Sequence, residues 1–333
     1  MTPPLIHRFS HRAMGTFVEV TIAGEDGSYA GQAAQAAFKE IDRLELLFSR
    51  FDPASEVNRI SRLRPGESLM IGLETFECLS VAEQIRAETN GAFDINVRSA
   101  LKYGGSEHGE NERPPLFELA RTEQGFEARR SESAGQSIRG TKLLGRKAGS
   151  EATVGRKPIQ RVSFQECPGG PWRPMDLDLG AIGKGYALDR ALALLADWSI
   201  GNALIHGGTS TAVAVGNAPE RQGWPVGVGG GWPCEEAPRE LLLAGRALSG
   251  SGTEVKGQHI IDPRTGGPAK GHVAAWALHP AAAAADALST AFMVVDTAEV
   301  EDYCRRHIDV WALVVKDYGD CRMFGEIREK EHV

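Results

Sequence analysis

Three glycines and one lysine fall within six residues near the middle of the chain, in Gly180-Ala-Ile-Gly183-Lys184-Gly185. The alternating Asp and Leu residues of 176–179 are typical of a short strand, and the Ala- and Leu-rich residues from Tyr186 onward are typical of a helix. A glycine-rich turn before a helix offers an anion free backbone N–H groups and the positive end of the helix dipole. The spacing matches neither the P-loop nor the G-x-G-x-x-G fingerprint. A phosphate site and an ordinary turn that uses glycine for its backbone freedom both remain open.

A second candidate site lies in the Ala-rich segment 281–295, which predicts a helix with one carboxylate, Asp286, in apolar surroundings. Thr290 follows four residues later, so both side chains lie on the same helix face. Both offer oxygen, the ligand that suits a hard cation such as Mg²⁺. The structural alternative makes Asp286 an exposed acid of the first turn and Thr290 a hydroxyl bonded to its own helix.

Other short motifs carry weaker signals. His259 heads the sequence His-Ile-Ile-Asp-Pro-Arg-Thr-Gly, where it could act as a general base, contact a phosphate, or be merely structural. Ala92-Phe93-Asp94 follows Asn90-Gly91 and could be an ordinary turn into a strand. Met14-Gly-Thr could be nothing more than the entry to a strand.

Composition sets outer limits on function. The 333 residues suffice for one large domain or two modest ones, and 42% hydrophobic and 24% charged residues are ordinary for a globular protein. A net charge of −7 argues against general nucleic-acid binding. No stretch is long and apolar enough to span a membrane, and the N-terminus shows neither a signal peptide nor a cysteine for lipid attachment. We therefore expect a cytoplasmic protein.

The cysteines are odd in number and form no C-x-x-C motif. This pattern predicts neither a disulfide framework nor a zinc site, and it suits a reducing compartment. The cysteines are Cys78, Cys167, Cys234, Cys304 and Cys321.

Hydrophobic periodicity predicts an α+β fold, because helices and strands are mixed and many strands follow one another directly. Expected helices span 29–49, 55–60, 74–88 and 281–295, and expected strands span 17–22, 203–205, 211–215, 224–228, 241–248, 259–261, 273–278 and 310–315. The segment 103–172 is rich in Gly and Arg, and only 116–120 and 162–164 suggest regular structure. We expect this segment to be a solvated, irregular and partly mobile insertion.

Seven motifs in order along 10–315 resemble the ApbE family, the FAD:protein FMN transferases. The most specific are the Gly-Lys-Gly turn and the His-Ile-Ile-Asp-Pro-Arg-Thr-Gly motif. The motifs are Met14-Gly-Thr, Gly91-Ala-Phe-Asp-Ile, Asp178-Leu-Gly-Ala-Ile-Gly-Lys-Gly-Tyr-Ala-Leu-Asp189, Asn202-Ala-Leu-Ile-His-Gly-Gly208, Ser249-Gly-Ser, His259-Ile-Ile-Asp-Pro-Arg-Thr-Gly266 and Ala285-Asp-Ala-Leu-Ser-Thr290.

The resemblance implies one two-lobed, T-fold-like α+β domain over 1–333, with FAD between the lobes. It also implies Mg²⁺-dependent transfer of FMN from FAD to a Thr or Ser hydroxyl of an acceptor protein, with release of AMP. Asp286, Thr290 and the backbone carbonyl of Ala181 would hold the metal. Lys184 and His259 would act at the phosphates, with His259 as base or phosphate contact. The FAD site would be lined by Met14, Phe51, Ala92, Phe93, Asp94, Asp178, Lys184 and Ile260.

The chain departs from the family pattern at several positions. Thr209 stands where Asp commonly follows the Gly-Gly turn, the stretch 249–253 lacks a tyrosine, and Phe51 replaces a Tyr or Trp. Many relatives are exported lipoproteins. Two alternative functions stay open: hydrolysis of FAD to FMN and AMP by the same residues, and binding of FAD without turnover.

Overall fold

The computed structural model describes residues 5–103, 117–130, 162–163, 175–230, 234, 237–253, 260–317 and 320–327. His259 and most of the segment 103–172 lie outside the described residues, so the expectations for them stay predictions. Within the described ranges the fold is a mixture of helices and antiparallel sheets, which confirms the predicted α+β class.

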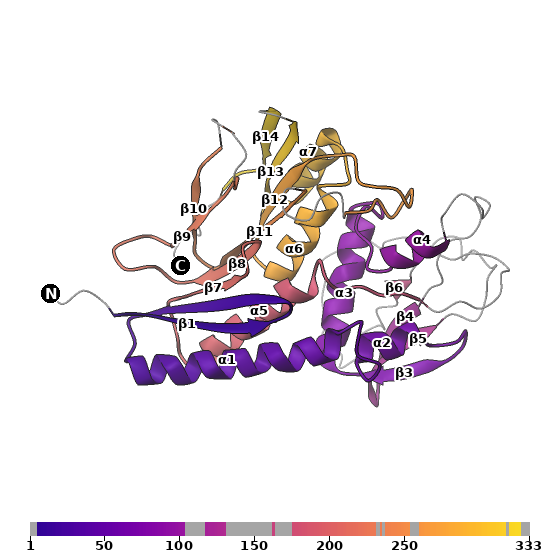
Figure 1. The fold of residues 1–333 in the computed structure, drawn as a ribbon, viewed down its shortest axis with the longest axis horizontal. Coiled ribbons are helices and arrows are strands. Elements are labelled where there is room, and N and C mark those ends of the chain that lie inside the picture. The colour runs from indigo at the N-terminus through magenta and orange to yellow at the C-terminus, as the bar shows by residue number, and fades with distance from the viewer. Residues whose placement is uncertain are drawn as a thin grey trace, which may run out of the picture.

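A large antiparallel sheet forms the body of the molecule (Figure 1). The described residues give it eight strands in the order β1-β2-β7-β8-β11-β12-β13-β14. Their bounds are β1 Ile6–Ala13, β2 Thr16–Ala23, β7 Ala203–Gly207, β8 Thr211–Val215, β11 Arg246–Gly252, β12 Ala274–His279, β13 Trp311–Asp317 and β14 Asp320–Phe324. Neighbours in this order are mostly close in sequence, so short turns connect much of the sheet.

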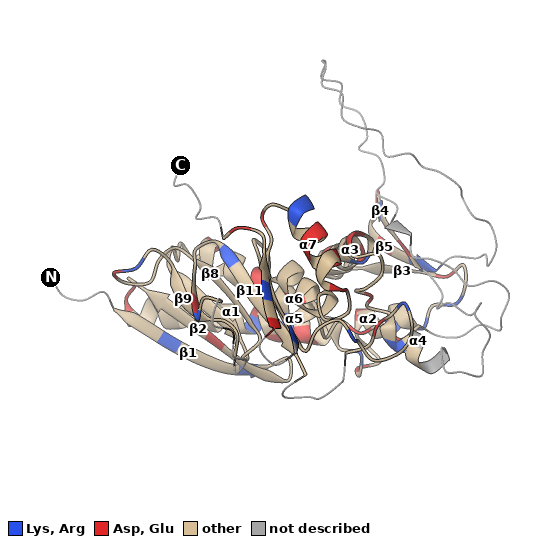
Figure 2. Cartoon of the chain, turned by 90° about the horizontal axis from the view of Figure 1, so that it is seen from above, with Lys and Arg blue, Asp and Glu red and all other residues tan. Residues whose placement is uncertain are grey.

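Helices cover one face of this sheet, which we call the inner face. These are α1 (Gly27–Phe48), α5 (Gly183–Asp197), α6 (Ala282–Ala291) and α7 (Thr297–Arg306). Asp26 caps α1 by accepting hydrogen bonds from the N–H groups of residues 28 and 29. In Figure 2 the ribbon of α6 is mostly tan, whereas α7 carries both blue and red. A helix with one charged residue suits its buried position against β11, β12 and α5.

The outer face of the sheet is partly covered by a hairpin of β9 (Trp224–Gly227) and β10 (Glu240–Leu243). Its inward residues close a second hydrophobic cluster with Leu248 and Leu313. Near this layer Cys234 forms a disulfide with Cys321 of β14. The expectation of no disulfide was wrong for this pair, because 87 residues separate the two cysteines in sequence and only the fold brings them together.

A smaller sheet, β3-β5-β4-β6, forms a second lobe beside the first (Figure 1). Its strands are β3 (Ser68–Ile71), β4 (Phe117–Thr122), β5 (Gly125–Arg130) and β6 (Val162–Ser163), and helices α2 (Glu56–Ser61), α3 (Leu73–Glu88) and α4 (Val97–Tyr103) accompany them. Helix α3 contacts both β5 and α6, so it connects the two lobes. None of the helices in the described ranges is long and apolar enough to cross a membrane.

Four sequence expectations were wrong in detail. Residues 176–179 form no strand, and α5 begins at Gly183 rather than Tyr186. The expected strand 241–248 is two strands, because Gly245 at φ +63° turns the chain between β10 and β11. The expected helix 281–295 ends at residue 291. Strands β1, β3, β5 and β14 and helices α4 and α7 were not predicted.

Candidate active site

Helices α5 and α6 approach each other very closely, and a glycine makes the approach possible. A β-carbon built on Gly185 would lie 2.2 Å from the carbonyl oxygen of Ala282 and 2.9 Å from Cα of Ala283. No larger residue fits there unless the helices separate. The last glycine of the Gly-Lys-Gly turn is therefore required for helix packing.

The carboxylate of Asp286 is the centre of a buried hydrogen-bond network at this crossing. Lys184 Nζ lies 3.3 Å from both carboxylate oxygens, and the backbone N–H of Gly185 donates to Oδ2 at 3.1 Å. The hydroxyls of Thr211 and Ser249 donate to Oδ1 at 3.2 and 3.1 Å. Asp286 is only 5% exposed, and these hydrogen bonds offset the cost of burying its polar side chain. The sequence alternative of an exposed Asp286 was wrong.

Thr290 lies one turn after Asp286, as the four-residue spacing predicts. Its hydroxyl donates to the backbone carbonyl of Asp286 at 3.3 Å, so the expected bond to its own helix is also present. The same hydroxyl lies 3.3 Å from Ser251 Oγ, which in turn lies 2.9 Å from Ser289 Oγ. A hydroxyl oxygen that donates one hydrogen bond keeps lone pairs for a cation. Strand β11 and helix α6 thus present a row of oxygen atoms next to Asp286.

Asp189 of α5 holds the beginning of α6. Its two carboxylate oxygens accept hydrogen bonds from the N–H groups of Ala282 and Ala283, at 2.7 and 2.8 Å. Residue 281, at the usual capping position, is alanine and supplies no side-chain bond. Burial raises the pKa of Asp189 to about 6, although the two backbone hydrogen bonds act in the opposite direction. The carboxylate therefore replaces the missing cap of α6.

The oxygen atoms at the crossing are donors of the kind that bind a hard cation. Ala181 lies in the turn before α5, and within the described residues its carbonyl oxygen accepts no hydrogen bond. With the carboxylate of Asp286 and the hydroxyl of Thr290 it makes an all-oxygen donor set, as Mg²⁺ prefers. No three His, Cys, Asp or Glu side chains of the described ranges gather into a metal-binding group. Since Lys184 balances the single carboxylate, a cation here needs further negative charge from the phosphates of a ligand.

We call a second group of residues the loop rim. It comprises the predicted residues Phe51, 92–94 and Asp178, together with Arg50, which was not predicted. Asp178 accepts a hydrogen bond from the N–H of Gly180 at 2.9 Å and pairs with Arg50 at 3.3 Å. The guanidinium of Arg50 lies 4.0 Å above the ring of Phe51, which is 77% exposed. Arg50 therefore connects two residues that the sequence placed at the FAD site without showing that they meet.

A backbone contact brings residues 92–94 to the same region. The N–H of Asp178 donates to the carbonyl of Ile95 at 2.7 Å, which places 92–94 beside the glycine-rich turn. Ala92 and Phe93 are buried in the core, and burial raises the pKa of Asp94. Ile260 is also buried and accepts a hydrogen bond from the N–H of Ala269 at 2.9 Å.

Met14 occupies a separate tight turn between β1 and β2. Its φ is +51° and that of Gly15 is +71°, so both residues are left-handed, as a two-residue hairpin turn requires. A methionine with left-handed backbone dihedral angles is unusual, because its Cβ crowds the following carbonyl oxygen. Thr16 follows the turn, and its Oγ1 lies 2.5 Å from the position of a β-carbon built on Gly208. Met14 thus lies in the turn before Thr16, which approaches the β7–β8 turn, and its contact with FAD stays a prediction.

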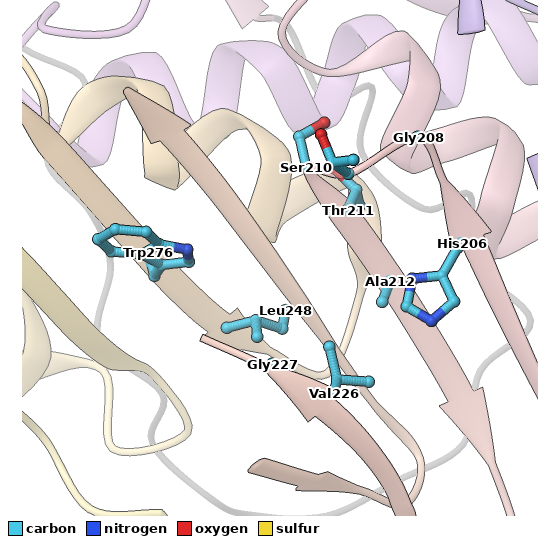
Figure 3. A pocket seen from close by; sticks show the side chains of 10 residues that line it. His206, Gly208, Ser210, Thr211, Ala212, Val226, Gly227, Leu248 and Trp276 are labelled. Atoms are coloured by element: carbon cyan, nitrogen blue, oxygen red, sulfur yellow. The ribbon is translucent and has the colours of Figure 1, made fainter. Parts of the chain in front are cut away.

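A cavity of about 310 Å³ lies at the outer face of the sheet, where Val226 and Gly227 of β9 line it together with Ala212 and Leu248 (Figure 3). Ala212 and Leu248 point into the outer hydrophobic cluster, whereas their neighbours Thr211 and Ser249 point toward the helices. Exposed Thr209, where ApbE relatives commonly carry Asp, also lines this cavity. Burial lowers the pKa of its lining residue His206, which favours the neutral imidazole. None of the predicted site residues lines the cavity.

Comparison with known proteins agrees with this arrangement. The profile of the ApbE family matches residues 14–314, nearly the whole chain. The chain belongs to the ApbE family. It is 25% identical over 310 residues to the FAD:protein FMN transferase of Salmonella typhimurium, across 89% of this chain and 80% of that protein.

Solved ApbE structures share the fold. The ApbE protein of Thermotoga maritima matches with a TM-score of 0.69 and 21% identity, over 96% of this chain and 97% of its own. The apo form of the Pseudomonas stutzeri flavinyl transferase ApbE matches with a TM-score of 0.68 and 20% identity, over 97% of each chain. The expected ApbE architecture is therefore confirmed.

Four residues of this ApbE chain are part of the arrangement without having been predicted: Asp189, Thr211, Ser249 and Arg50. Thr211 and Ser249 are paired across β8 and β11, which only strand register can reveal. Asp189 did carry one signal, because it lies four residues after Gly185 and so shares its helix face. The spacing shows that Asp189 and Gly185 lie on the same face of α5, but it does not show which residues this face contacts.

Proposed function

We propose that this protein transfers FMN from FAD to a Ser or Thr hydroxyl of an acceptor protein, with Mg²⁺ bound and AMP released. The observation that carries the proposal is the buried network around Asp286 in a chain of the ApbE family. The named activity of its relatives supports the flavin substrate and the protein acceptor. Mg²⁺, the type of hydroxyl and AMP release rest on the donor set and on the family resemblance.

The reaction is a phosphoryl-type transfer, which depends mainly on positioning and charge neutralisation. The acceptor oxygen forms a bond to the phosphorus that carries riboflavin, and the bond from this phosphorus to the bridging oxygen breaks. AMP leaves with that oxygen, and the hydroxyl proton passes to a base. Lys184 is partly buried at the crossing with its ammonium beside Asp286, where it offsets the negative charge of the phosphates. His259 as the base stays a prediction from the sequence.

Asp286, Thr290 and the carbonyl of Ala181 are the groups that would hold Mg²⁺. When bound, the ion neutralises phosphate oxygens and aligns the pyrophosphate. The backbone N–H of Gly185 and the hydroxyls of Thr211 and Ser249 keep the Asp286 carboxylate in one orientation. The protein therefore contributes a carboxylate that is already fixed before FAD arrives.

The loop rim is proposed to hold the rings of FAD. Phe51 offers an exposed aromatic face with Arg50 already stacked on it. Asp178 is fixed by Arg50 and by the N–H of Gly180, so its position is set by the turn that leads to Lys184. Met14, 92–94 and Ile260 are carried over from the family as further lining residues.

Mass spectrometry of an acceptor peptide tests the proposal. The peptide carries the family's Ser/Thr-Gly-Ala-Ser/Thr type of sequence and is incubated with FAD, Mg²⁺ and the protein. We expect a mass gain of one FMN with the natural protein and none with Asp286→Asn or with a chelator added. Absence of the gain across several such peptides contradicts the transfer.

The same incubation distinguishes the alternative functions. Steady release of AMP from FAD without any acceptor identifies hydrolysis. Yellow protein whose FAD stays intact for hours with Mg²⁺ identifies flavin binding without turnover. Because the same residues would hold FAD in all three cases, chromatography of the nucleotide products is needed beside the mass measurement.

A cytoplasmic location stays a prediction, and the Cys234–Cys321 disulfide bears against it. Disulfides persist mainly in oxidising compartments, whereas cytoplasmic thiols are usually kept reduced. Alkylation of intact cells followed by peptide mass mapping measures the state of this pair in place. A pair found as free thiols in fractionated cytoplasm supports the prediction, and an oxidised pair outside the cytoplasm overturns it.

A further inference from the structure

The two helices at the crossing cap each other. Asp286 of α6 accepts a hydrogen bond from the N–H of Gly185 in the first turn of α5, at 3.1 Å. Asp189 of α5 accepts hydrogen bonds from the N–H groups of Ala282 and Ala283 in the first turn of α6. Each helix thus provides a carboxylate for the otherwise unpaired N–H groups of the other. We call this pair of contacts the reciprocal cap.

The geometry makes the two contacts depend on each other. Gly185 and Asp189 lie one helical turn apart on α5, and Ala282 and Asp286 lie one turn apart on α6. The close contact between Gly185 and the Ala282 carbonyl lies between them. A shift of the first turn of α6 away from Asp189 therefore moves Asp286 relative to Gly185 and Lys184.

We propose that Asp189 is a positioning residue, which fixes the Asp286 carboxylate for Mg²⁺ and the phosphates of FAD by holding the first turn of α6. The inference rests on the proposed function, because it assigns Asp286 to that site. Asp189 itself contacts backbone N–H groups of α6 and not the ligand. No capping residue of α6 itself can replace it, since residue 281 is alanine.

The chemistry of the contact requires a carboxylate. Two N–H groups approach two separate oxygens, and asparagine can offer only one oxygen to them. The amide NH₂ of asparagine would face an N–H group, and the first turn of α6 would have to shift. Asp189→Asn therefore keeps the size of the side chain and removes one of the two oxygens that accept hydrogen bonds from α6.

Titration of the protein with FAD, followed by flavin fluorescence at several Mg²⁺ concentrations, tests the inference. For Asp189→Asn we expect FAD affinity to fall by about tenfold, the effect of losing a cap of this kind, and half-saturation to need more Mg²⁺. The matched control is Asp197→Asn, an exposed aspartate at the end of the same helix, which should leave both values unchanged. Melting temperatures are recorded for all variants.

A double variant separates positioning from a general structural role. If Asp189 acts through Asp286, Asp189→Asn should cause no further loss of FAD affinity in an Asp286→Asn background, while its effect on melting temperature persists. Equal losses in both backgrounds would overturn the inference. Asp189→Ser also keeps one acceptor oxygen, and we expect its loss of FAD affinity to lie between zero and the loss in Asp189→Asn.

The remaining outcomes are also decisive. Unchanged affinity and Mg²⁺ requirement in Asp189→Asn would overturn the inference, as would variants at this position that all melt below the assay temperature. Failure of the proposed function is seen in the acceptor-peptide assay: FAD binds to the natural protein, but no FMN reaches the peptide. In that case the affinity ratios still decide the role of Asp189.

Discussion

The α5–α6 crossing and the loop rim hold the predicted site residues in opposite ways. At the crossing, Asp286 is 5% exposed and is held by Lys184, Thr211, Ser249 and a backbone N–H. On the rim, Phe51 is 77% exposed, and its ring contacts the guanidinium of its neighbour Arg50. The crossing is therefore ordered by the fold itself, whereas the ring of Phe51 on the rim is left exposed for a ligand to cover.

The difference agrees with what each region is proposed to bind. A buried charge is tolerated only when it is paired, so the groups for phosphates and a cation are fixed by helices and by hydrogen bonds. Flat aromatic rings need exposed apolar surface instead, which loops can offer at small cost. We expect variants at the crossing to change stability and binding together, and variants on the rim to change binding alone.

The largest effect is expected from Asp286→Ala. The change leaves the Lys184 ammonium and the Gly185 N–H without their buried partner, so the free energy of unfolding should fall by about 3 kcal/mol. Transfer of FMN should fall below detection. Urea unfolding measures the free energy of unfolding, and the peptide assay measures the transfer of FMN. Asp197→Ala is the control. If Asp286→Ala unfolds with the same free energy as the natural protein, the network does not stabilise the crossing.

Gly185→Ala should have the next largest effect. The added carbon meets the Ala282 carbonyl at 2.2 Å, so α6 must move away, at a cost of about 2 kcal/mol of stability. Affinity for FAD should fall as well, because the Asp286 carboxylate moves with α6. Gly201→Ala is the matched control, since a β-carbon there meets nothing within 4 Å. Equal melting curves for the two variants would contradict the packing at the crossing.

Lys184→Met separates the two roles of the lysine. Without the ammonium, Asp286 keeps an unbalanced charge, so Mn²⁺ as a probe for Mg²⁺ should bind the FAD-free protein more tightly, by about tenfold. Affinity for FAD should fall, because the phosphates lose their cation. Electron paramagnetic resonance of free Mn²⁺ measures the first value. Weaker Mn²⁺ binding in this variant would show that Lys184 does not compete with the metal.

The smallest effect is expected from Phe51→Ala on the rim. Loss of the exposed ring should weaken FAD binding by roughly 1 kcal/mol, the scale of an aromatic stacking contact. Stability should be unchanged because the ring is 77% exposed. Phe17→Ala removes another exposed phenylalanine, on the outer face of β2, and should leave FAD binding as it is. Equal FAD affinities in the two variants would remove Phe51 from the site.

The sequence drew attention to Asp286, Thr290 and Lys184 at the crossing but not to the residues that support them. The i,i+4 spacing placed Asp286 and Thr290 on one helix face, and the glycine-rich turn drew attention to Lys184. The role of Asp189 depends on a helix 93 residues away in sequence, so no local pattern contains it. The disulfide between Cys234 and Cys321 was missed for the same reason.

The error at 176–179 has a different physical cause. Leu177 and Leu179 are buried, while Asp176 and Asp178 pair with arginines, so the chain alternates as a strand does. Its hydrogen bonds go instead to Ile95 and to the segment around Ser61, so no ladder forms. Alternation therefore indicated an extended chain with two different sides, which need not belong to a sheet.

Calorimetric titration with FAD and with inorganic pyrophosphate, both with Mg²⁺, tests the division between crossing and rim most directly. Pyrophosphate has no rings, so it reports on the crossing alone. We predict that Lys184→Met weakens the binding of both ligands by a similar factor, while Phe51→Ala weakens only FAD. Pyrophosphate binding that falls in Phe51→Ala, or that is unchanged in Lys184→Met, would contradict the account.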